Sequence, residues 1–210
     1  MMITEEMLDA LRHQVSEGMS QRRFIHTAEV EKMAAYLGSI YAPDKIPVLR
    51  AAALLHDVTK EYSYAEQIEL CQKYGVELEA DARFAPKTLH ARTAAAIIPE
   101  KFPSFADAEI ISCVRYHTTG RADMTLSEKL IYLADYIDLS RTFEDCVKLR
   151  NYFLAPEPEK LSENELLAHL DATLIMSYDM TVRALVEEGT PISLDTMAAR
   201  NQLIREKLSR

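Results

Sequence analysis

Six histidine and aspartate residues stand in apolar surroundings at widely spaced positions of this 210-residue chain. Two of them are adjacent, because His56 and Asp57 end the apolar run "AAALL". Ionised carboxylates are almost never buried unless another group pairs with or coordinates them, so this aspartate needs a partner. The full set is His26, His56, Asp57, His90, His117 and Asp135.

Any one of these positions, taken alone, favours a hydrogen-bonded core residue over a ligand. Together, however, four histidines and two aspartates must all be satisfied in one core, and a divalent cation satisfies several at once. Imidazole and carboxylate are ligands of zinc, iron, manganese or nickel rather than calcium, and the lack of thiolates argues against a structural zinc site. A scaffold in which all six are merely hydrogen-bonded remains the alternative.

The elements that carry these residues are predicted to be helices. From Ser20 onward, Val30, Met33, Ala34, Leu37 and Tyr41 follow helical spacing, and His26 lies on the same stripe. Further helices are expected over residues 4–17, 47–59, 64–74, 87–98, 104–117, 126–138, 144–153, 163–188 and 193–208. Because no alternating strand of useful length is found, the predicted fold class is all-α.

Several helix boundaries are marked in the sequence. Ser63, Thr125 and Ser162 are each followed three residues later by Glu, which is the spacing of a capping box. Gly75 and Gly189 stand where a helix would stop. The proline-containing stretch "NYFLAPEPEKLSEN" is predicted to be a hinge or long loop before the C-terminal helices.

The composition narrows the class of protein. A formal charge of −9, from 24 basic and 33 acidic side chains, does not favour binding to nucleic acid or to an anionic membrane. Cys71, Cys113 and Cys146 are odd in number and lie in apolar segments, as expected of buried thiols in a reducing compartment. No apolar run approaches the roughly 18 residues of a membrane span, and no signal peptide is seen, so we expect a cytoplasmic protein.

The order of the six residues resembles the HD-domain metallohydrolases. The connecting sequence is similar to one branch, the YqeK-type HD proteins, which hydrolyse diadenosine tetraphosphate symmetrically to two ADP. The similar stretches are "RRFIHTAEVEKMAAYL", "AALLHDVTKEYS", "PKTLH", "AEIISCVRYHTTGRADMTLSEKLIYLADYID" and "TMAARNQL". They run over most of the chain. The resemblance implies an HD-domain helical bundle, a bimetal centre and a nucleotide pocket.

The resemblance carries all six residues over as metal ligands. An aspartate has two oxygens and can bridge, so we expect two divalent ions about 3.5–4 Å apart that share Asp57. His26, His56 and Asp135 would surround one ion, and His90 with His117 the other. Iron is the metal expected from the family, with manganese or another transition metal as alternatives. Such ions lower the pKa of bound water from 15.7 towards about 7, so no Ser or Cys nucleophile is needed.

Substrate contacts are also carried over from the family. Lys60, three residues after Asp57, is predicted to project beside the metals if the helix continues, and it is assigned with Asp57 to catalysis. Its alternative is an ordinary solvated lysine. The residues predicted to bind substrate are Arg23, Lys60, Thr118, Thr119, Gly120 and Arg141. Tyr116, Tyr132 and Tyr136 could stack on a base, although core packing is favoured.

The sequence departs from the family at three positions near these residues. Ala91 stands where Gly is usual, and Asp138 and Leu139 stand where Glu-Pro is usual. None of these positions is a predicted ligand, so the departures bear on pocket shape and substrate preference.

Other functions stay open at this point. One is an HD-domain nucleotidase or deoxynucleotide phosphohydrolase, because the metal ligands do not determine which nucleoside the substrate carries. Another is a catalytically silent nucleotide-binding module. The expected domain layout is an HD metallohydrolase domain over residues 1–155, with C-terminal helices over 156–210 packing on the same domain. A homodimer is also possible.

Overall fold

The computed structural model describes residues 3–78 and 84–209, and no strand occurs within them, which confirms the all-α prediction. Short 3-10 turns join several of the helices. The α-helices are α1 (Glu5–Glu17), α2 (Gln21–Tyr41), α3 (Ile46–Leu55), α4 (Tyr64–Lys73), α5 (Leu89–Lys101), α6 (Ala108–Tyr116), α7 (Leu126–Ile137), α8 (Glu144–Leu154), α9 (Glu163–Glu187) and α10 (Leu194–Leu208).

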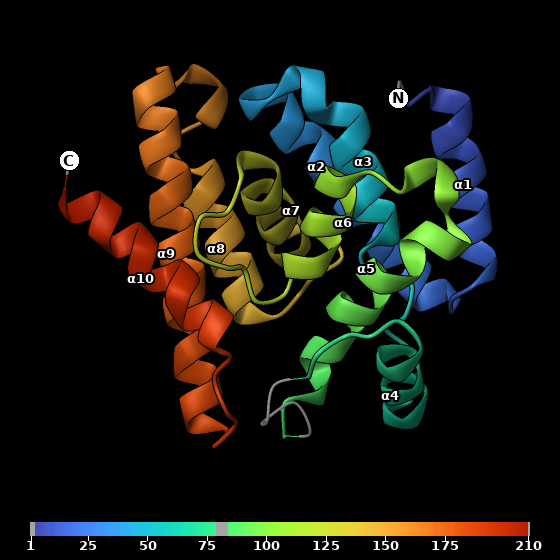
Figure 1. The fold of residues 1–210 in the computed structure, drawn as a ribbon. Helices are drawn as coiled ribbons and strands as arrows, with labels where there is room; N and C mark the ends of the chain where they lie inside the picture. The colour runs from blue at the N-terminus through green and yellow to red at the C-terminus, as the bar shows by residue number, and fades with distance from the viewer. Residues whose placement is uncertain (1–2, 79–83, 210) are drawn as a thin grey trace.

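Helices α2, α3, α5, α6 and α7 pack together in the middle of the molecule. Helix α1 covers α3 on one side, and α4 packs against α5. On the opposite side α8 and α9 lie against α7, and α10 crosses α9 (Figure 1). The central helices are therefore covered on both sides, and α9 and α10 form one wall of the molecule.

The contact between α2 and α3 is the most extensive in this bundle. The apolar residues 51–55 of α3 are completely buried, as is the predicted stripe of α2 at Val30, Ala34 and Leu37. At Gly38, an added Cβ would lie 2.9 Å from Ile46 and 3.0 Å from Leu49. A glycine at this position therefore allows the two helices to approach closely.

The predicted boundaries are mostly confirmed. Capping boxes form at Ser63, Thr125 and Ser162, and the predicted stops Gly75 and Gly189 have φ of +64° and +63° just after α4 and α9. The segment between α8 and α9 is a loop with one 3-10 turn at Pro158–Lys160, as the prolines indicated.

Two of the expected helices are shorter than predicted. The helix expected over 104–117 begins only at Ala108, because a separate 3-10 turn occupies Pro103–Phe105. The helix expected over 47–59 ends at Leu55, so that boundary was wrong and the helix does not continue to Lys60. From His56 to Tyr62 the chain forms turns instead, with Lys60 N donating to Asp57 O at 2.9 Å.

Side chains of neighbouring helices hold this turn in place. Thr59 Oγ1 donates to the carbonyl oxygen of His90 at 3.0 Å, and Gln67 Nε2 donates to Thr59 O at 2.5 Å. The carbonyl of Thr59 is thereby satisfied by α4, and the hydroxyl is tied to α5. These tertiary contacts compete with continued helix, and apolar periodicity gives no sign of them.

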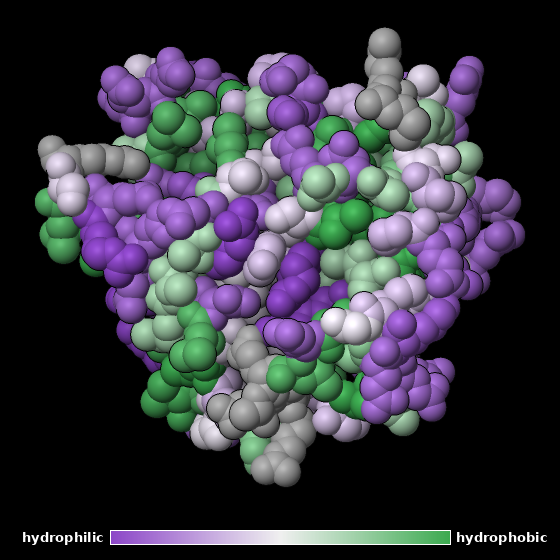
Figure 2. Space-filling model, in the orientation of Figure 1, coloured by the Kyte–Doolittle hydropathy of each residue, from purple (hydrophilic) through white to green (hydrophobic). Residues whose placement is uncertain are grey.

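The surface drawn in Figure 2 is largely hydrophilic, with separate apolar patches. One such patch covers the end of α9 and the start of α10, where Val186 and Leu194 are exposed. Among the described residues, no helix is both long and apolar enough to cross a bilayer.

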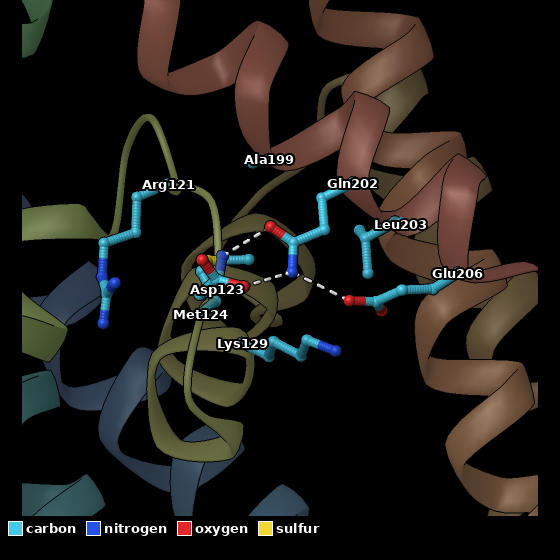
Figure 3. A pocket seen from close by; sticks show the side chains of 8 residues that line it. All are labelled: Arg121, Asp123, Met124, Lys129, Ala199, Gln202, Leu203 and Glu206. Atoms are coloured by element: carbon cyan, nitrogen blue, oxygen red, sulfur yellow. Dashed lines mark hydrogen bonds between the residues drawn. The ribbon is translucent and has the colours of Figure 1, made fainter.

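Helix α10 is attached to the segment between α6 and α7 by paired hydrogen bonds. Gln202 accepts from Asp123 N at 2.8 Å and donates to Asp123 Oδ1 at 2.6 Å, as Figure 3 shows. The same amide donates to Glu206 at 2.9 Å. Residues near position 120 are thus held between the central helices and the C-terminal ones.

Candidate metal centre

The six predicted residues converge in the centre of the bundle. Within each of several three-residue groups drawn from them, the candidate ligand atoms lie within 4.8 Å of one another. They come from α2, α5 and α7 and from the residues that directly follow α3 and α6. His26 lies on α2, His56 caps α3, Asp57 follows it, His90 begins α5, His117 caps α6 and Asp135 lies on α7.

The carboxylate of Asp57 lies between two groups of histidines. Its Oδ1 is 3.1 Å from His90 Nε2 and 3.8 Å from His117 Nε2. Its Oδ2 is 3.4 Å from His56 Nε2 and 3.7 Å from His26 Nε2. The two oxygens therefore face the two sets of residues that were assigned to separate ions.

Asp135 belongs to the group that contains His26 and His56. Its Oδ1 lies 3.0 Å from His26 Nε2 and 3.7 Å from His56 Nε2. In the second group, His90 Nε2 and His117 Nε2 are 3.1 Å apart. Neighbouring donors bound at about 2.0–2.2 Å to one cation lie about 3–3.6 Å from each other, so these separations suit shared metal ions.

The histidine orientations also suit metal ligation. His56 Nδ1 lies 2.6 Å from Ala53 O, and His117 Nδ1 lies 2.7 Å from Val114 O. Because a carbonyl can only accept, Nδ1 must carry the proton, and Nε2 then presents a lone pair to the cluster. His56 Nε2 is buried without a hydrogen-bond partner among the described residues. A buried ring nitrogen in this state is expected where the nitrogen binds a metal ion.

Asp138 is a member of the centre that the sequence analysis treated only as a departure from the family pattern. It is completely buried, and its Oδ2 lies 3.3 Å from His26 Nδ1. Its other oxygen accepts from Ser140 N at 2.8 Å. A carboxylate behind a ligating imidazole fixes the ring and raises its basicity. The available signal was a second aspartate three residues after Asp135.

Two arginines neutralise the carboxylates at the edge of the centre. Arg23 Nη1 is 2.7 Å from Asp57 Oδ2, and Arg141 pairs with Asp135. Burial by itself raises the pKa of both aspartates. For Asp57 the nearby His56 and His90 reverse this effect, and for Asp135 Arg141 does so, so that each pKa lies well below its usual range.

The histidines differ in their protonation. Burial lowers the pKa of His90 and of His117, which keeps both imidazoles neutral and able to bind a cation. Burial acts in the same direction on His26, but contacts with Asp135 and Asp138 outweigh it and raise the pKa to about 9. A metal ion at His26 therefore has to displace a proton.

Lys60 reaches the centre from the turn rather than from a continued helix. Its Nζ lies 3.3 Å from both ring nitrogens of His90. Burial lowers its pKa, although Asp57 and Asp135 act in the opposite direction. The structure thus places this cation beside the cluster, where the sequence analysis expected it, by a different backbone path.

A cavity of about 530 Å³, here called the C-terminal cavity, opens beside the centre between α7 and the α9–α10 pair. Of the predicted residues, it is lined by Lys60, His117, Thr118, Thr119, Asp135 and Arg141. Tyr132 and Tyr136 line it as well. The hydroxyl of Thr118 is buried without a partner among the described residues.

Helices α9 and α10 and the segment that joins them supply lining residues that the sequence analysis did not assign. They are Thr181, Leu185, Glu188, Thr190, Pro191, Ser193 and Thr196. Thr196 lies in the similar stretch "TMAARNQL", which was the one sequence signal for this wall.

Gly120 and Tyr116 are placed elsewhere. Gly120 has φ +63° and is buried against Tyr178, and it does not line the cavity. The guanidinium groups of Arg115 and Arg121 lie 4.8 and 5.1 Å from the centre of the Tyr116 ring. Tyr132 is buried and packs on Tyr178, although one part of it faces the cavity.

Comparison with known proteins agrees with this geometry. A protein named symmetrical bis(5'-nucleosyl)-tetraphosphatase from Bacillus subtilis is 30% identical over 200 residues, which cover 95% of this chain and 97% of that protein. A protein of the same name from Halalkalibacterium halodurans is 29% identical over 193 residues, which cover 92% and 95%. One from Staphylococcus aureus is 31% identical over 145 residues, covering 69% and 73%.

A solved structure from Clostridium acetobutylicum has the same fold, with a TM-score of 0.81 and 30% identity. It is described as a predicted HD superfamily hydrolase involved in NAD metabolism, and the match covers 94% of this chain and 97% of that one. The HD domain model matches residues 23–140, a range that contains all six clustered residues. With the family's characteristic histidines and aspartates gathered at one site, the chain belongs to the HD domain family.

Proposed function

We propose that this protein hydrolyses diadenosine tetraphosphate symmetrically to two ADP. The observation that carries the proposal is the buried His/Asp cluster, in which the two oxygens of Asp57 face different histidines. The names of three relatives at about 30% identity, two of them matched over more than nine tenths of this chain, support the choice of substrate.

We propose that two divalent ions bind at the cluster, with iron first and manganese or another transition metal as alternatives. His26, His56 and Asp135 would hold one ion, His90 and His117 the other, and Asp57 would bridge them. When bound, such ions make water acidic enough to attack at neutral pH and polarise phosphoryl oxygens. The donor spacings and the neutral His90 and His117 support this assignment.

The cationic side chains are proposed to bind the polyphosphate. Lys60 lies between the cluster and the C-terminal cavity, where its ammonium can donate to phosphate oxygens as charge shifts to the departing ADP. Arg141 lines the same cavity and Arg23 contacts Asp57, so both can orient phosphates. Thr118 and Thr119 offer hydroxyls, while the role of Gly120 is proposed to be the backbone turn that presents them.

One ADP half is proposed to occupy the C-terminal cavity. Its volume of about 530 Å³ is in the range of small-molecule sites, and its lining combines aromatic and apolar groups with cations near the cluster. Residues 156–210 would then complete the nucleotide site, while residues 1–155 hold the metals. We therefore propose a single domain with two parts, one that binds the metals and one that completes the nucleotide site.

Product analysis tests the function. Metal-loaded protein is incubated anaerobically with diadenosine tetraphosphate, ATP, dATP, AMP and NAD, and products are separated by chromatography. We expect ADP alone from the dinucleotide, with much slower turnover of the others. AMP plus ATP from the dinucleotide, or phosphate from the mononucleotides as the main reaction, would refute the proposal.

The same sample distinguishes an active enzyme from a catalytically silent nucleotide-binding module. Elemental analysis is done first, so that turnover is measured on protein of known metal content. Full metal occupancy without hydrolysis of any nucleotide in the panel would favour the module.

A further inference from the structure

A second groove borders the metal centre and has no role in the proposal so far. It has a volume of about 560 Å³ and is called here the arginine groove. The lining residues that matter below are Arg22, Arg23, Ile25, His26, Arg141 and Phe143. They come from the first two turns of α2 and from the segment that joins α7 to α8.

The arginine groove and the C-terminal cavity meet the cluster from different sides. The groove reaches it at His26, while the cavity reaches it at His117 and Asp135. Among the residues that the structure describes, Arg141 alone lines both. A chain of phosphates that crosses the metal centre from the cavity would therefore leave it into the groove.

Three arginines line the groove, although the chain as a whole carries a formal charge of −9. Arg23 and Arg141 each pair with one aspartate of the cluster, and the Nε of Arg23 is buried without a hydrogen-bond partner among the described residues. Arg22 is exposed. Guanidinium groups in this arrangement suit an anionic ligand such as a diphosphate.

The outer part of the groove is apolar. Phe143 is 68% exposed and Ile25 is 53% exposed. Phe143 stands at the N-cap position of α8 but forms no side-chain cap hydrogen bond, and it is not part of the buried core. The ring is therefore accessible to a base, which can stack on it.

We propose that the arginine groove binds the second ADP half of the dinucleotide, with its phosphates at the arginines and its base against Phe143 and Ile25. This inference rests on the proposed function. A bond broken at the midpoint of a tetraphosphate has a nucleoside diphosphate on each side, so both halves must be accommodated beside the cluster. The cavity and the groove, of about 530 and 560 Å³, each lie in the range of small-molecule sites.

The test compares two substrates that differ by one nucleoside. Diadenosine tetraphosphate and adenosine 5'-tetraphosphate share the tetraphosphate, but the second lacks one adenosine. We expect wild-type kcat/KM to be higher for the dinucleotide. In Phe143→Ala, the ratio of the two kcat/KM values should fall about tenfold, mainly through KM, because stacking on one base is lost.

Leu139→Ala is the matched control. Leu139 is also an exposed apolar residue, at 65%, and lies four residues before Phe143, but it lines neither the groove nor the C-terminal cavity. It should leave the ratio unchanged. An unchanged ratio in Phe143→Ala, which includes an equal loss on both substrates, would overturn the assignment of the groove.

Binding of the product gives a second measurement that does not depend on turnover of the shorter substrate. Metal-loaded wild-type protein should bind two ADP per chain in equilibrium dialysis. Arg22→Ala and Phe143→Ala should each weaken one of the two equivalents. A single ADP per chain in the wild type would refute the proposed ADP site in the groove. If Phe143→Ala converts a dimer to monomers and affects both substrates equally, Phe143 is a dimer contact and the proposal is also refuted.

Failure of the two proposals can be told apart. If the wild type does not convert diadenosine tetraphosphate to ADP, the proposed function fails. If it does so, but Phe143→Ala changes neither the ratio of the two kcat/KM values nor the number of ADP bound, only the assignment of the groove fails.

Discussion

Asp57 is the residue on which the proposed centre depends most, because its two oxygens face different pairs of imidazoles. His90 contacts only one side of it. The two residues should therefore differ in how many ions their replacement removes.

Replacement of Asp57 by Asn should remove both ions, whereas His90→Ala should remove about one. Asn keeps the shape but lacks the charge that the proposed bridge requires. Activity should fall at least about a thousandfold in Asp57→Asn, since metals contribute several kcal/mol to such reactions. The measurement is elemental analysis of folded protein, followed by turnover.

His13→Ala serves as the control, because His13 is 77% exposed and lies on α1, which carries none of the clustered residues. Equal metal loss in Asp57→Asn and His90→Ala would contradict the bridging role.

Replacement of Asp138 by Asn tests the residue behind His26. The amide keeps the size but removes the negative charge that lies 3.3 Å from His26 Nδ1, so His26 becomes a poorer ligand. Metal affinity should fall about 10- to 100-fold. Titration with Mn²⁺ measures this, and activity at saturating metal should recover most of the loss. An unchanged affinity would leave Asp138 with a purely structural role.

At the scale of elements, the segment between α6 and α7 connects the metal centre to the C-terminal helices. It begins at His117, continues through Gly120 at positive φ, and is attached to α10 through Asp123 and Gln202. A Cβ at Gly120 would lie 1.9 Å from Tyr178 Oη. This segment therefore has little freedom to shift without moving α9.

Gly120→Ala should destabilise the fold more than Gly75→Ala. Both glycines have nearly the same φ, +63° and +64°, but a Cβ at Gly75 would meet nothing within 4 Å. Gly75→Ala therefore measures the backbone strain, roughly 1–3 kcal/mol, and the excess in Gly120→Ala measures the clash with Tyr178.

Chemical denaturation of both variants and of the wild type gives the two differences. The double variant Gly120→Ala/Tyr178→Phe should recover part of the excess, because the hydroxyl is gone. Equal destabilisation by Gly120→Ala and Gly75→Ala would show that the segment can move aside.

For the molecule as a whole, the cluster joins α2, α3, α5, α6 and α7 at one point. Ions bound there contact elements far apart in sequence and are absent from the unfolded state. Their binding should stabilise the entire bundle rather than one helix.

Metal should therefore raise the melting temperature cooperatively, and a chelator should lower it. At a free ion concentration of 100 times Kd, the gain in unfolding free energy is about 2.7 kcal/mol per site. Differential scanning calorimetry with Mn²⁺ and with EDTA measures the shift. Asp57→Asn should show almost none, and a wild type insensitive to both additions would favour the hydrogen-bonded scaffold.

A homodimer stays a prediction at this scale. An apolar patch covers the end of α9 and the start of α10 in Figure 2. Val186 and Leu194 of these two helices are exposed. Cytoplasmic location and the absence of nucleic acid partners also stay predictions.

The sequence by itself determined the all-α class, most helix boundaries and the identity of the six clustered residues, because apolar periodicity, capping residues and costly buried charges are local signals. Only the tertiary structure decided that α3 ends at Leu55, that Asp138 lies behind His26, and that α9 and α10 line one side of a cavity. These features depend on contacts such as Thr59 with His90 and Gln67, between residues distant in sequence. A one-dimensional pattern shows which residues need partners, but packing in space selects the partners.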